Sequence, residues 1–267
     1  MTRLRFFQVD AFADRAFAGN PAAVMPLDQW LDDEVLQAIA AENNLSETAF
    51  YMPDGDGDAD FELRWFTPTT EVIMCGHATL ASGHVVLGLD QARDRVRFRT
   101  RRAGILEVRR DGDGYAMALP AWTPAPRALP HIVAALGVDA GAVRDTLWHD
   151  AGNSLIVFDH ADQVMALTPD FRALATHGDV LVIATAPGTD SDVMSRVFAP
   201  GAGIDEDPVT GAAHAVLTPY WAKRLGRAQF TAFQASTRGG RIACTDAGDR
   251  VMLGGGCVSV IEGSFLL

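Results

Sequence analysis

The chain has 267 residues, enough for two domains of ordinary size, and its 48% of hydrophobic residues can fill a core. A formal net charge of −12 argues against nucleic-acid and anionic-membrane partners, because phosphate binding needs clustered Lys and Arg. The three cysteines, Cys75, Cys244 and Cys257, suit a reducing cytoplasm better than a disulfide framework. They form no CxxC pair, so no metal site is expected. No apolar run reaches the roughly 20 residues that span a bilayer, and the first residues indicate a strand rather than a signal peptide.

Hydrophobic periodicity and turn residues divide the chain into short elements. Helical spacing predicts helices at residues 32–43, 76–87, 130–136, 170–176 and 212–223. Apolar or alternating runs predict strands at residues 4–11, 22–25, 45–52, 60–66, 95–101, 104–110, 115–119, 155–158, 164–167, 180–186, 228–235, 240–246, 250–254 and 257–261. Several strands, one small-residue helix and more strands follow one another twice, which indicates a duplicated α/β fold.

A proline-rich break at residues 121–126 marks the expected boundary between the halves. We place an N-terminal half at residues 1–120, joined by the C-terminal strand at about 256–267. The C-terminal half then covers residues 126–255.

The most informative motif is the segment 203–214, where the acids Asp205, Glu206 and Asp207 and a proline run through Thr210 into a helix start. The first turn of a helix has unpaired backbone N–H groups and the positive end of the helix dipole. Because Gly211 and Ala212 are small, an anionic group can approach those N–H groups. The adjacent acids can exchange protons there, although acids ahead of a helix are also favoured by the dipole alone.

A second helix start of the same kind lies at residues 66–81, where Cys75-Gly76-His77 leads into small residues. His77 is interpreted as a polar group of a site or as a core histidine bonded to a carbonyl. The thiol of Cys75 would have a lowered pKa at a helix start, but it can equally be a small buried residue. His84 and His214 lie farther along the two helices and are expected to be structural.

Glu47 lies in an apolar stretch, between Leu45 and Phe50. Burial disfavours the charged form of a carboxyl group, and such a group can both remove and return a proton near neutral pH. The alternatives are a solvated carboxylate at a strand edge and a cap for backbone N–H groups. Asn20, in a Gly-Asn-Pro loop, either contacts a ligand or holds its own turn.

Five segments together resemble the phenazine-biosynthesis PhzF-like family. They are residues 19–24 (GNPAAV), 45–50 (LSETAF), 66–68 (FTP), 75–79 (CGHAT) and 207–211 (DPVTG), and their order and spacing agree over essentially the whole chain. The resemblance implies a diaminopimelate-epimerase-like fold, in which two similar halves each wrap a curved, mostly antiparallel sheet around a central helix, with the active site between them. It also implies a cytoplasmic, cofactor-free homodimer.

The resemblance assigns roles by position. Glu47 matches the family's acid/base carboxylate, His77 and Asp207 match its supporting polar groups, and Gly76 matches a backbone position that faces the ligand. Two departures stand out. Ala212 replaces a common serine, so the substrate is expected to differ, and Pro208 occupies the second thiol position of the amino-acid epimerases. A two-thiol racemase mechanism is therefore not expected.

These observations favour a cofactor-independent isomerase of a small carboxylated metabolite. Glu47, Asp207 and His77 are its candidate catalytic residues, without a metal. The candidate substrate-binding residues are Asn20, Cys75, Gly76, Thr210, Gly211 and Ala212. Two other hypotheses remain: a thiol enzyme, such as a hydrolase, that depends on Cys75, and a non-catalytic protein that binds a small molecule in the same fold.

Overall fold

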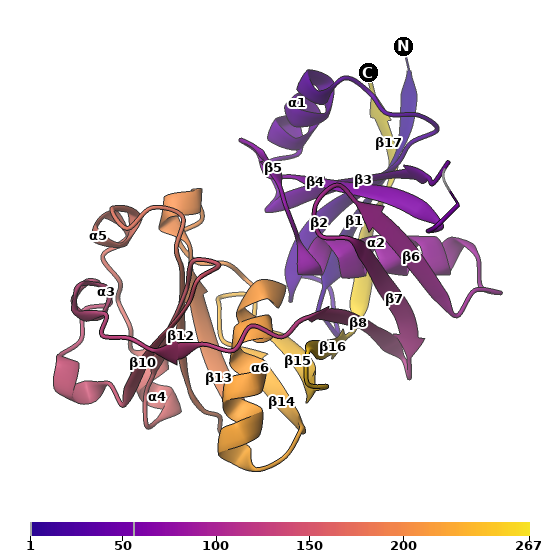
Figure 1. Cartoon of the computed structure of the whole chain (residues 1–267). Coiled ribbons are helices and arrows are strands. Elements are labelled where there is room, and N and C mark those ends of the chain that lie inside the picture. Colours follow the sequence, from indigo (N-terminus) through magenta and orange to yellow (C-terminus); the bar gives the residue numbers. More distant parts are fainter. Residues whose placement is uncertain (1, 56) are drawn as a thin grey trace. The chain divides into compact units, whose positions relative to one another are not determined.

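The structure is a computed structural model that describes residues 2–55 and 57–267. The chain forms two compact units (Figure 1). Unit 1 contains the chain up to Ala118 together with Gly254–Leu267, and unit 2 is Leu119–Leu253. Among the described residues, no helix has the length and apolar character needed to cross a membrane.

Unit 1 is a single curved sheet with one helix on each face. Its strands are β1 (Arg3–Ala11), β2 (Asn20–Pro26), β3 (Glu47–Pro53), β4 (Phe61–Phe66), β5 (Glu71–Val72), β6 (Arg95–Thr100), β7 (Ile105–Asp111), β8 (Gly114–Pro120) and β17 (Cys257–Leu266). Its helices are α1 (Asp33–Asn43) and α2 (Gly76–Leu89). Helix α2 contacts β1, β2, β3, β6, β7 and β17, so the sheet wraps around it, while α1 covers β3 and β4 from the other face.

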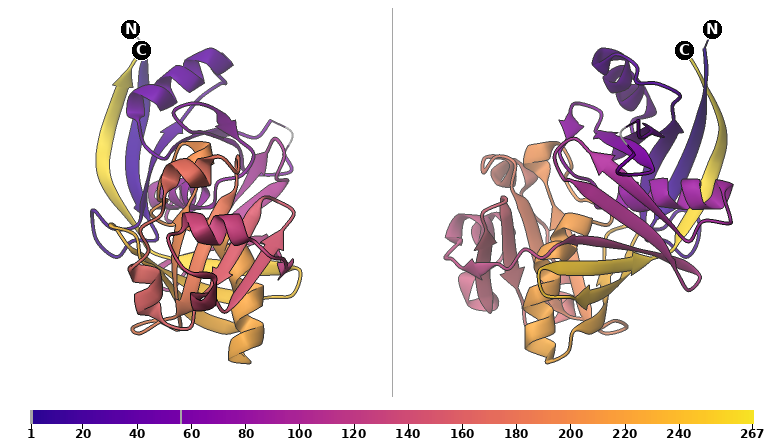
Figure 2. Two further views of the ribbon diagram at one scale, coloured as in Figure 1. Left: turned by 90° about the vertical axis from the view of Figure 1, so that its left-hand side faces the viewer. Right: turned by 45° about the vertical axis from the view of Figure 1, so that its right-hand side comes forward.

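The two chain ends meet in unit 1. Strand β17 pairs antiparallel with β1 along its length, and backbone hydrogen bonds of 2.7 and 2.9 Å join Thr2 to Leu267. Figure 2 shows the two strands side by side. The C-terminal strand therefore completes the N-terminal half of the sequence.

Unit 2 has the same kinds of element. Its strands are β9 (Ala125–Pro126), β10 (Asp145–His149), β11 (Asn153–Val157), β12 (Leu181–Pro187), β13 (Val193–Phe198), β14 (Gln229–Gln234), β15 (Gly240–Asp246) and most of β16 (Arg250–Gly255). The helices are α3 (Pro130–Ala135), α4 (Ala161–Met165), α5 (Phe171–Ala175) and α6 (Gly211–Leu225), with 3₁₀ turns at Ala140–Ala142 and Pro200–Ala202. Buried apolar side chains of α3, α4 and α5 pack against β11, β12 and β13 to form one core cluster.

The strand pairings of the two units repeat one another. In unit 1, β1–β2, β3–β4 and β6–β7 are antiparallel pairs, joined in parallel as β2–β3 and β4–β6. In unit 2, β10–β11, β12–β13 and β14–β15 are antiparallel, joined in parallel as β11–β12 and β13–β14. The crossovers β4–β6 and β13–β14 contain α2 and α6. The predicted fold of two similar halves, each with a central helix, is confirmed.

One predicted strand is wrong. Residues 164–167 were expected to be extended, but Val164 lies in helix α4, which ends at Met165. The Gln163 side chain accepts hydrogen bonds from the backbone N–H groups of Asp159 and His160, at 3.1 and 2.9 Å, and so caps the helix start. A short apolar run has no periodicity of its own, and this cap favours the helix. Strand β10 was not predicted.

Helix α6 contains a proline in its middle, Pro219. Proline has no N–H group to donate to the carbonyl four residues earlier, which here belongs to Ala215. That carbonyl instead accepts a hydrogen bond of 3.0 Å from the backbone N–H of Trp122. The segment that follows β8 is thereby held against the central helix of unit 2.

Candidate active site

Strand β3 directs Glu47 toward the central helix of unit 1. Side chains alternate across a strand, and the hydroxyl of Thr48 accepts a 3.1 Å hydrogen bond from Asn43 of α1. Glu47 therefore lies on the opposite face, which α2 covers. Its side chain is 12% exposed, so it is largely shielded from water.

The start of α2 places Cys75, Gly76 and His77 next to that carboxylate. Cys75 is the N-cap with an extended backbone (φ −139°, ψ 112°), and no described side chain caps the helix. The hydroxyl of Thr79 donates to the carbonyl of Cys75 at 2.6 Å and stiffens the first turn. The free N–H groups of this turn can receive an anionic group.

Ser46, Asn20 and His77 form a hydrogen-bonded chain that ends beside Glu47. Ser46 donates to Asn20 Oδ1 at 3.1 Å, which leaves Asn20 Nδ2 to donate to His77 Nδ1 at 3.2 Å. With Nδ1 accepting, the first ring proton lies on Nε2, and Nε2 is 3.0 Å from Glu47 Oε2. Beyond this contact with each other, neither Nε2 nor Oε2 has a hydrogen-bond partner among the described residues. Both atoms therefore retain hydrogen-bonding capacity in a buried position.

The charges in this cluster act on two pKa values. Burial lowers the pKa of His77, whereas the negative charge of the adjacent Glu47 carboxylate raises it above its ordinary value. Burial and the nearby Glu47 raise the pKa of the Cys75 thiol, against a smaller opposing effect of His77. The thiol is therefore protonated near neutral pH. The lowered thiol pKa expected from the helix start is wrong, because desolvation dominates.

Glu47, Cys75 and His77 together offer ligand atoms that lie within 4.8 Å of one another. One metal ion needs the lone pairs of its ligands to converge on it. Here Cys75 Sγ lies 3.5 Å from Nδ1 of His77, whereas Glu47 lies beside Nε2. The two groups thus face different nitrogens of one ring, so their lone pairs do not converge on one point.

In unit 2, the turn before α6 is held by a compact set of hydrogen bonds. The Thr210 hydroxyl donates to Asp207 Oδ2 in a short hydrogen bond. Gln234 of β14 accepts from the Thr210 backbone N–H at 2.9 Å and donates to the Asp207 carbonyl at 2.7 Å. Asp207 is 9% exposed, and Gly211 begins the helix directly after Thr210. The half-buried Ala212 follows as the second helical residue.

The three adjacent acids, Asp205, Glu206 and Asp207, have different surroundings. Asp205 is exposed, and Glu206 forms a two-pronged ion pair with Arg196, at 2.7 and 3.0 Å. Asp207 alone is buried beside the helix start. The three acids therefore lie in different surroundings, because successive side chains leave the turn in different directions.

His84 and His214 bond to neighbouring elements, as expected for structural residues. His84 bridges Tyr115 and Ser259, at 3.0 and 2.9 Å. His214 is fully buried, and its Nδ1 lies 2.8 Å from the Thr210 carbonyl. A carbonyl can only accept, so Nδ1 carries the proton. Burial lowers the pKa of His214 to about 4.

The structure brings the predicted site residues together in two clusters, one in each unit. Asn20, Glu47, Cys75, Gly76 and His77 form the first cluster. The second cluster contains Asp207, Thr210, Gly211 and Ala212. Two supporting residues were missed. Ser46 lies inside a motif that was already identified, whereas Gln234 lies on a strand 24 residues beyond Thr210 and carries no local signal.

Two repeated halves, each with a central helix and polar side chains at its start, define the class of epimerase-like folds. A family model described as phenazine biosynthesis-like protein matches residues 9–263, and the chain belongs to this family. An uncharacterized isomerase of Pseudomonas aeruginosa is 48% identical over 99% of both chains. The human phenazine biosynthesis-like domain-containing protein is 37% identical over 98% of this chain and 99% of its own.

Solved structures agree with this assignment. A PhzF-family protein of Enterococcus faecalis has a TM-score of 0.90 at 39% identity and covers 100% of both chains. A hydroxyproline epimerase of Agrobacterium vitis has a TM-score of 0.61 at 12% identity, with 98% of this chain and 92% of that chain covered. The second likeness concerns the fold alone.

Proposed function

We propose that this protein is an isomerase that moves a proton within a small carboxylated metabolite, without a cofactor. The supporting observation is the buried pair of His77 Nε2 and Glu47 Oε2, which lie 3.0 Å apart while neither atom makes a hydrogen bond of normal geometry with a described residue. Buried polar atoms are normally hydrogen-bonded, so such a pair is a candidate for contact with substrate. Relatives named isomerases support the same class of reaction.

Glu47 is assigned as the group that removes and returns the proton. A general base must reach the substrate proton within hydrogen-bond distance, and Oε2 is available for that contact. His77 acts beside it as a hydrogen-bond donor, with its ring fixed by Asn20 and Ser46. The free N–H groups at the start of α2 are suited to a substrate carboxylate, and so are those at the start of α6.

The experiment is a metabolite screen in deuterium oxide, read by mass spectrometry or NMR. The expected result is one compound that gains deuterium with the wild-type protein. Glu47→Gln keeps the size of the side chain but removes its basicity, and it should show no gain. Glu107→Gln, which alters a carboxylate on β7 that is 39% exposed, is the matched control and should behave like wild type. Equal deuterium uptake by Glu47→Gln would reject the assignment.

A second candidate is a thiol enzyme, such as a hydrolase, because Cys75 Sγ lies 3.5 Å from a histidine nitrogen. The raised pKa of the Cys75 thiol argues against it, since the thiolate is the nucleophile. Inactivation by iodoacetamide, with an equally inactive Cys75→Ala variant, would favour this candidate. Tight ligand binding without any deuterium exchange would instead favour a non-catalytic binding protein.

We also propose a homodimer in the cytoplasm. Three free cysteines are consistent with a reducing compartment. Strand β17 pairs with β1 and exposes Ile261 and Leu266 at 49% and 50%. Long exposed edge strands with apolar side chains favour pairing with another chain. Sedimentation of the wild type as a monomer at micromolar concentration would contradict the dimer.

A further inference from the structure

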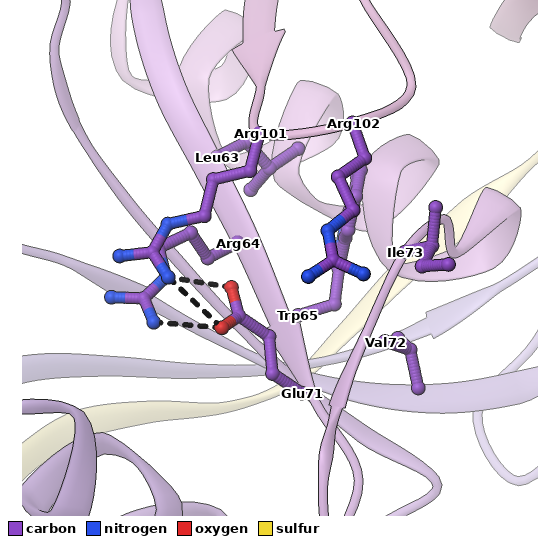
Figure 3. A pocket seen from close by; sticks show the side chains of 8 residues that line it. All are labelled: Leu63, Arg64, Trp65, Glu71, Val72, Ile73, Arg101 and Arg102. Carbon is purple, nitrogen blue, oxygen red and sulfur yellow. Dashed lines mark hydrogen bonds and ion pairs between the residues drawn. The ribbon is translucent and has the colours of Figure 1, made fainter.

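Unit 1 contains a small pocket at a fork in its sheet (Figure 3). Strand β6 pairs with β4 at Phe61–Leu63, whereas β5 pairs with β4 at Trp65 and Phe66. Arg64 lies between these two pairings, and the hollow beside it has a volume of about 110 Å³. A water molecule in the liquid takes up roughly 30 Å³, so the hollow is large enough for a carboxylate or phosphate group.

Guanidinium groups outnumber carboxylates at this pocket. Arg64, Arg101 and Arg102 line it together with one acid, Glu71. Arg64 is 2% exposed and forms a two-pronged ion pair with Glu71, at 2.8 and 2.9 Å. It also contacts Asp33 at 2.9 Å, while Arg101 contacts Glu71 at 3.1 Å. Three cations thus face two carboxylates, which leaves one positive charge uncompensated in a protein whose net charge is −12.

That uncompensated charge is on Arg102. No described acid lies within ion-pair distance of its guanidinium, and Figure 3 shows it opposite the Glu71 ion pairs with no interaction drawn to it. The Arg102 side chain extends from the turn between β6 and β7. It borders the pocket on the side of Trp65 and Ile73. A guanidinium in this position can bind a carboxylate with two parallel hydrogen bonds.

Two residues that line the pocket also contain a buried N–H donor without a partner among the described residues. Trp65 is 1% exposed, and its Nε1 has no hydrogen-bond partner in the described parts of the chain. The same holds for Nη1 of Arg64. Buried indole N–H groups usually have a partner, and each buried unsatisfied donor requires an explanation. A bound acceptor group would supply one.

We propose that this pocket is a binding site for a small carboxylate. The carboxylate oxygens would accept hydrogen bonds from Arg102 and from Trp65 Nε1, within the positive field of Arg64. The pocket also borders Glu71–Ile73, the segment that leads directly to Cys75-Gly76-His77. A carboxylate bound in the pocket would therefore restrict the position of the segment that leads into α2. The inference concerns binding alone and does not depend on the proposed isomerase reaction.

The test uses ¹⁵N-labelled full-length protein and follows the assigned indole N–H resonance of Trp65 during titration with sodium acetate. Sodium chloride at matched ionic strength is the reference. The expected result is a saturable shift with acetate that chloride does not reproduce. Arg102→Gln should need at least tenfold more acetate. Arg109→Gln removes an exposed arginine of β7 outside the pocket and should leave the titration unchanged.

Three results would overturn the proposal: an acetate shift equal to the chloride shift, no shift at all, or an Arg102→Gln titration equal to that of wild type.

Once a substrate is found, its turnover distinguishes two sources of the carboxylate. Competitive inhibition by acetate would indicate that the pocket holds part of the substrate. Non-competitive inhibition or activation would indicate a separate effector.

Discussion

The helix starts of α2 and α6 occupy equivalent places in the repeated fold, yet they differ in how their polar groups are satisfied. At α2, His77 Nε2 and Glu47 Oε2 lie 3.0 Å apart without a hydrogen bond of normal geometry to any described residue. At α6, Gln234 ties the Asp207 carbonyl to the backbone of Thr210. The pair at α2 has no further partner among the described residues, whereas the Asp207–Thr210 turn before α6 is held by its own contacts.

The two buried histidines show the same difference. The pKa of His77 is raised by the neighbouring Glu47 carboxylate against the effect of burial, while the pKa of His214 is lowered to about 4, chiefly by burial. One duplicated scaffold thus holds one histidine beside a negative group and another in a neutral, apolar setting. The group that transfers the proton in the proposed reaction is therefore expected in unit 1.

The largest expected effect comes from Glu47→Gln. Loss of a general base typically lowers the rate 10²- to 10⁴-fold. Asp207→Asn keeps an acceptor for the Thr210 hydroxyl and loses only the charge, so its rate should fall by about 10- to 100-fold. The measurement is kcat of both variants on the substrate found in deuterium oxide. Equal losses would remove the distinction between the two helix starts.

The next effect concerns pH and the stability of unit 2. The folded pKa of His214 is about 4, below the value of about 6.5 for an unfolded histidine. Because the unfolded histidine binds a proton more readily than the folded one, His214 favours the folded state above pH 6.5. This contribution to the free energy of unfolding is lost as the pH falls from 6.5 to 4. The loss is about 3 kcal/mol, because each pKa unit corresponds to about 1.4 kcal/mol.

Urea unfolding at pH 7.5 and pH 4.5 measures this loss. His214→Asn keeps a donor for the Thr210 carbonyl and should lose less stability on acidification than the wild type. His131→Asn, at an exposed position of α3, is the control and should match the wild type. The same acid-induced loss in His214→Asn would show that other groups cause it.

The smallest expected effect is at Ala212, where the family commonly has serine. A hydrogen bond to a buried polar group contributes about 1–3 kcal/mol when its loss leaves that group unpaired. The resemblance to the PhzF-like family implies isomerisation of a dihydro-hydroxyanthranilate. Ala212→Ser should therefore raise kcat/KM toward that compound, on which the wild type should act poorly. If the wild type turns this compound over efficiently and Ala212→Ser has the same kcat/KM, the residue at position 212 does not determine substrate choice.

Most of the fold could be predicted from the sequence, because both central helices and most strands have clear periodicity and turn signals. The strand expected at 164–167 failed because a short apolar run is ambiguous until the Gln163 cap is seen. Glu47 and His77 are 30 positions apart, so spacing could not relate them, whereas the family motifs assigned both residues to the site. Gln234, the separate environments of the three acids, and the unpartnered Trp65 Nε1 depend on tertiary packing, which no local pattern encodes.

The proline in α6 has a consequence for engineering this protein. A proline inside a helix ordinarily costs about 3 kcal/mol relative to alanine, so Pro219 is an obvious target for a stabilising replacement. Here the missing N–H leaves the Ala215 carbonyl available to Trp122 at 3.0 Å. An alanine at position 219 would introduce a donor that competes with Trp122 for the same oxygen. The replacement would regularise the helix while loosening the segment that enters unit 2, so propensity scales would overestimate its benefit.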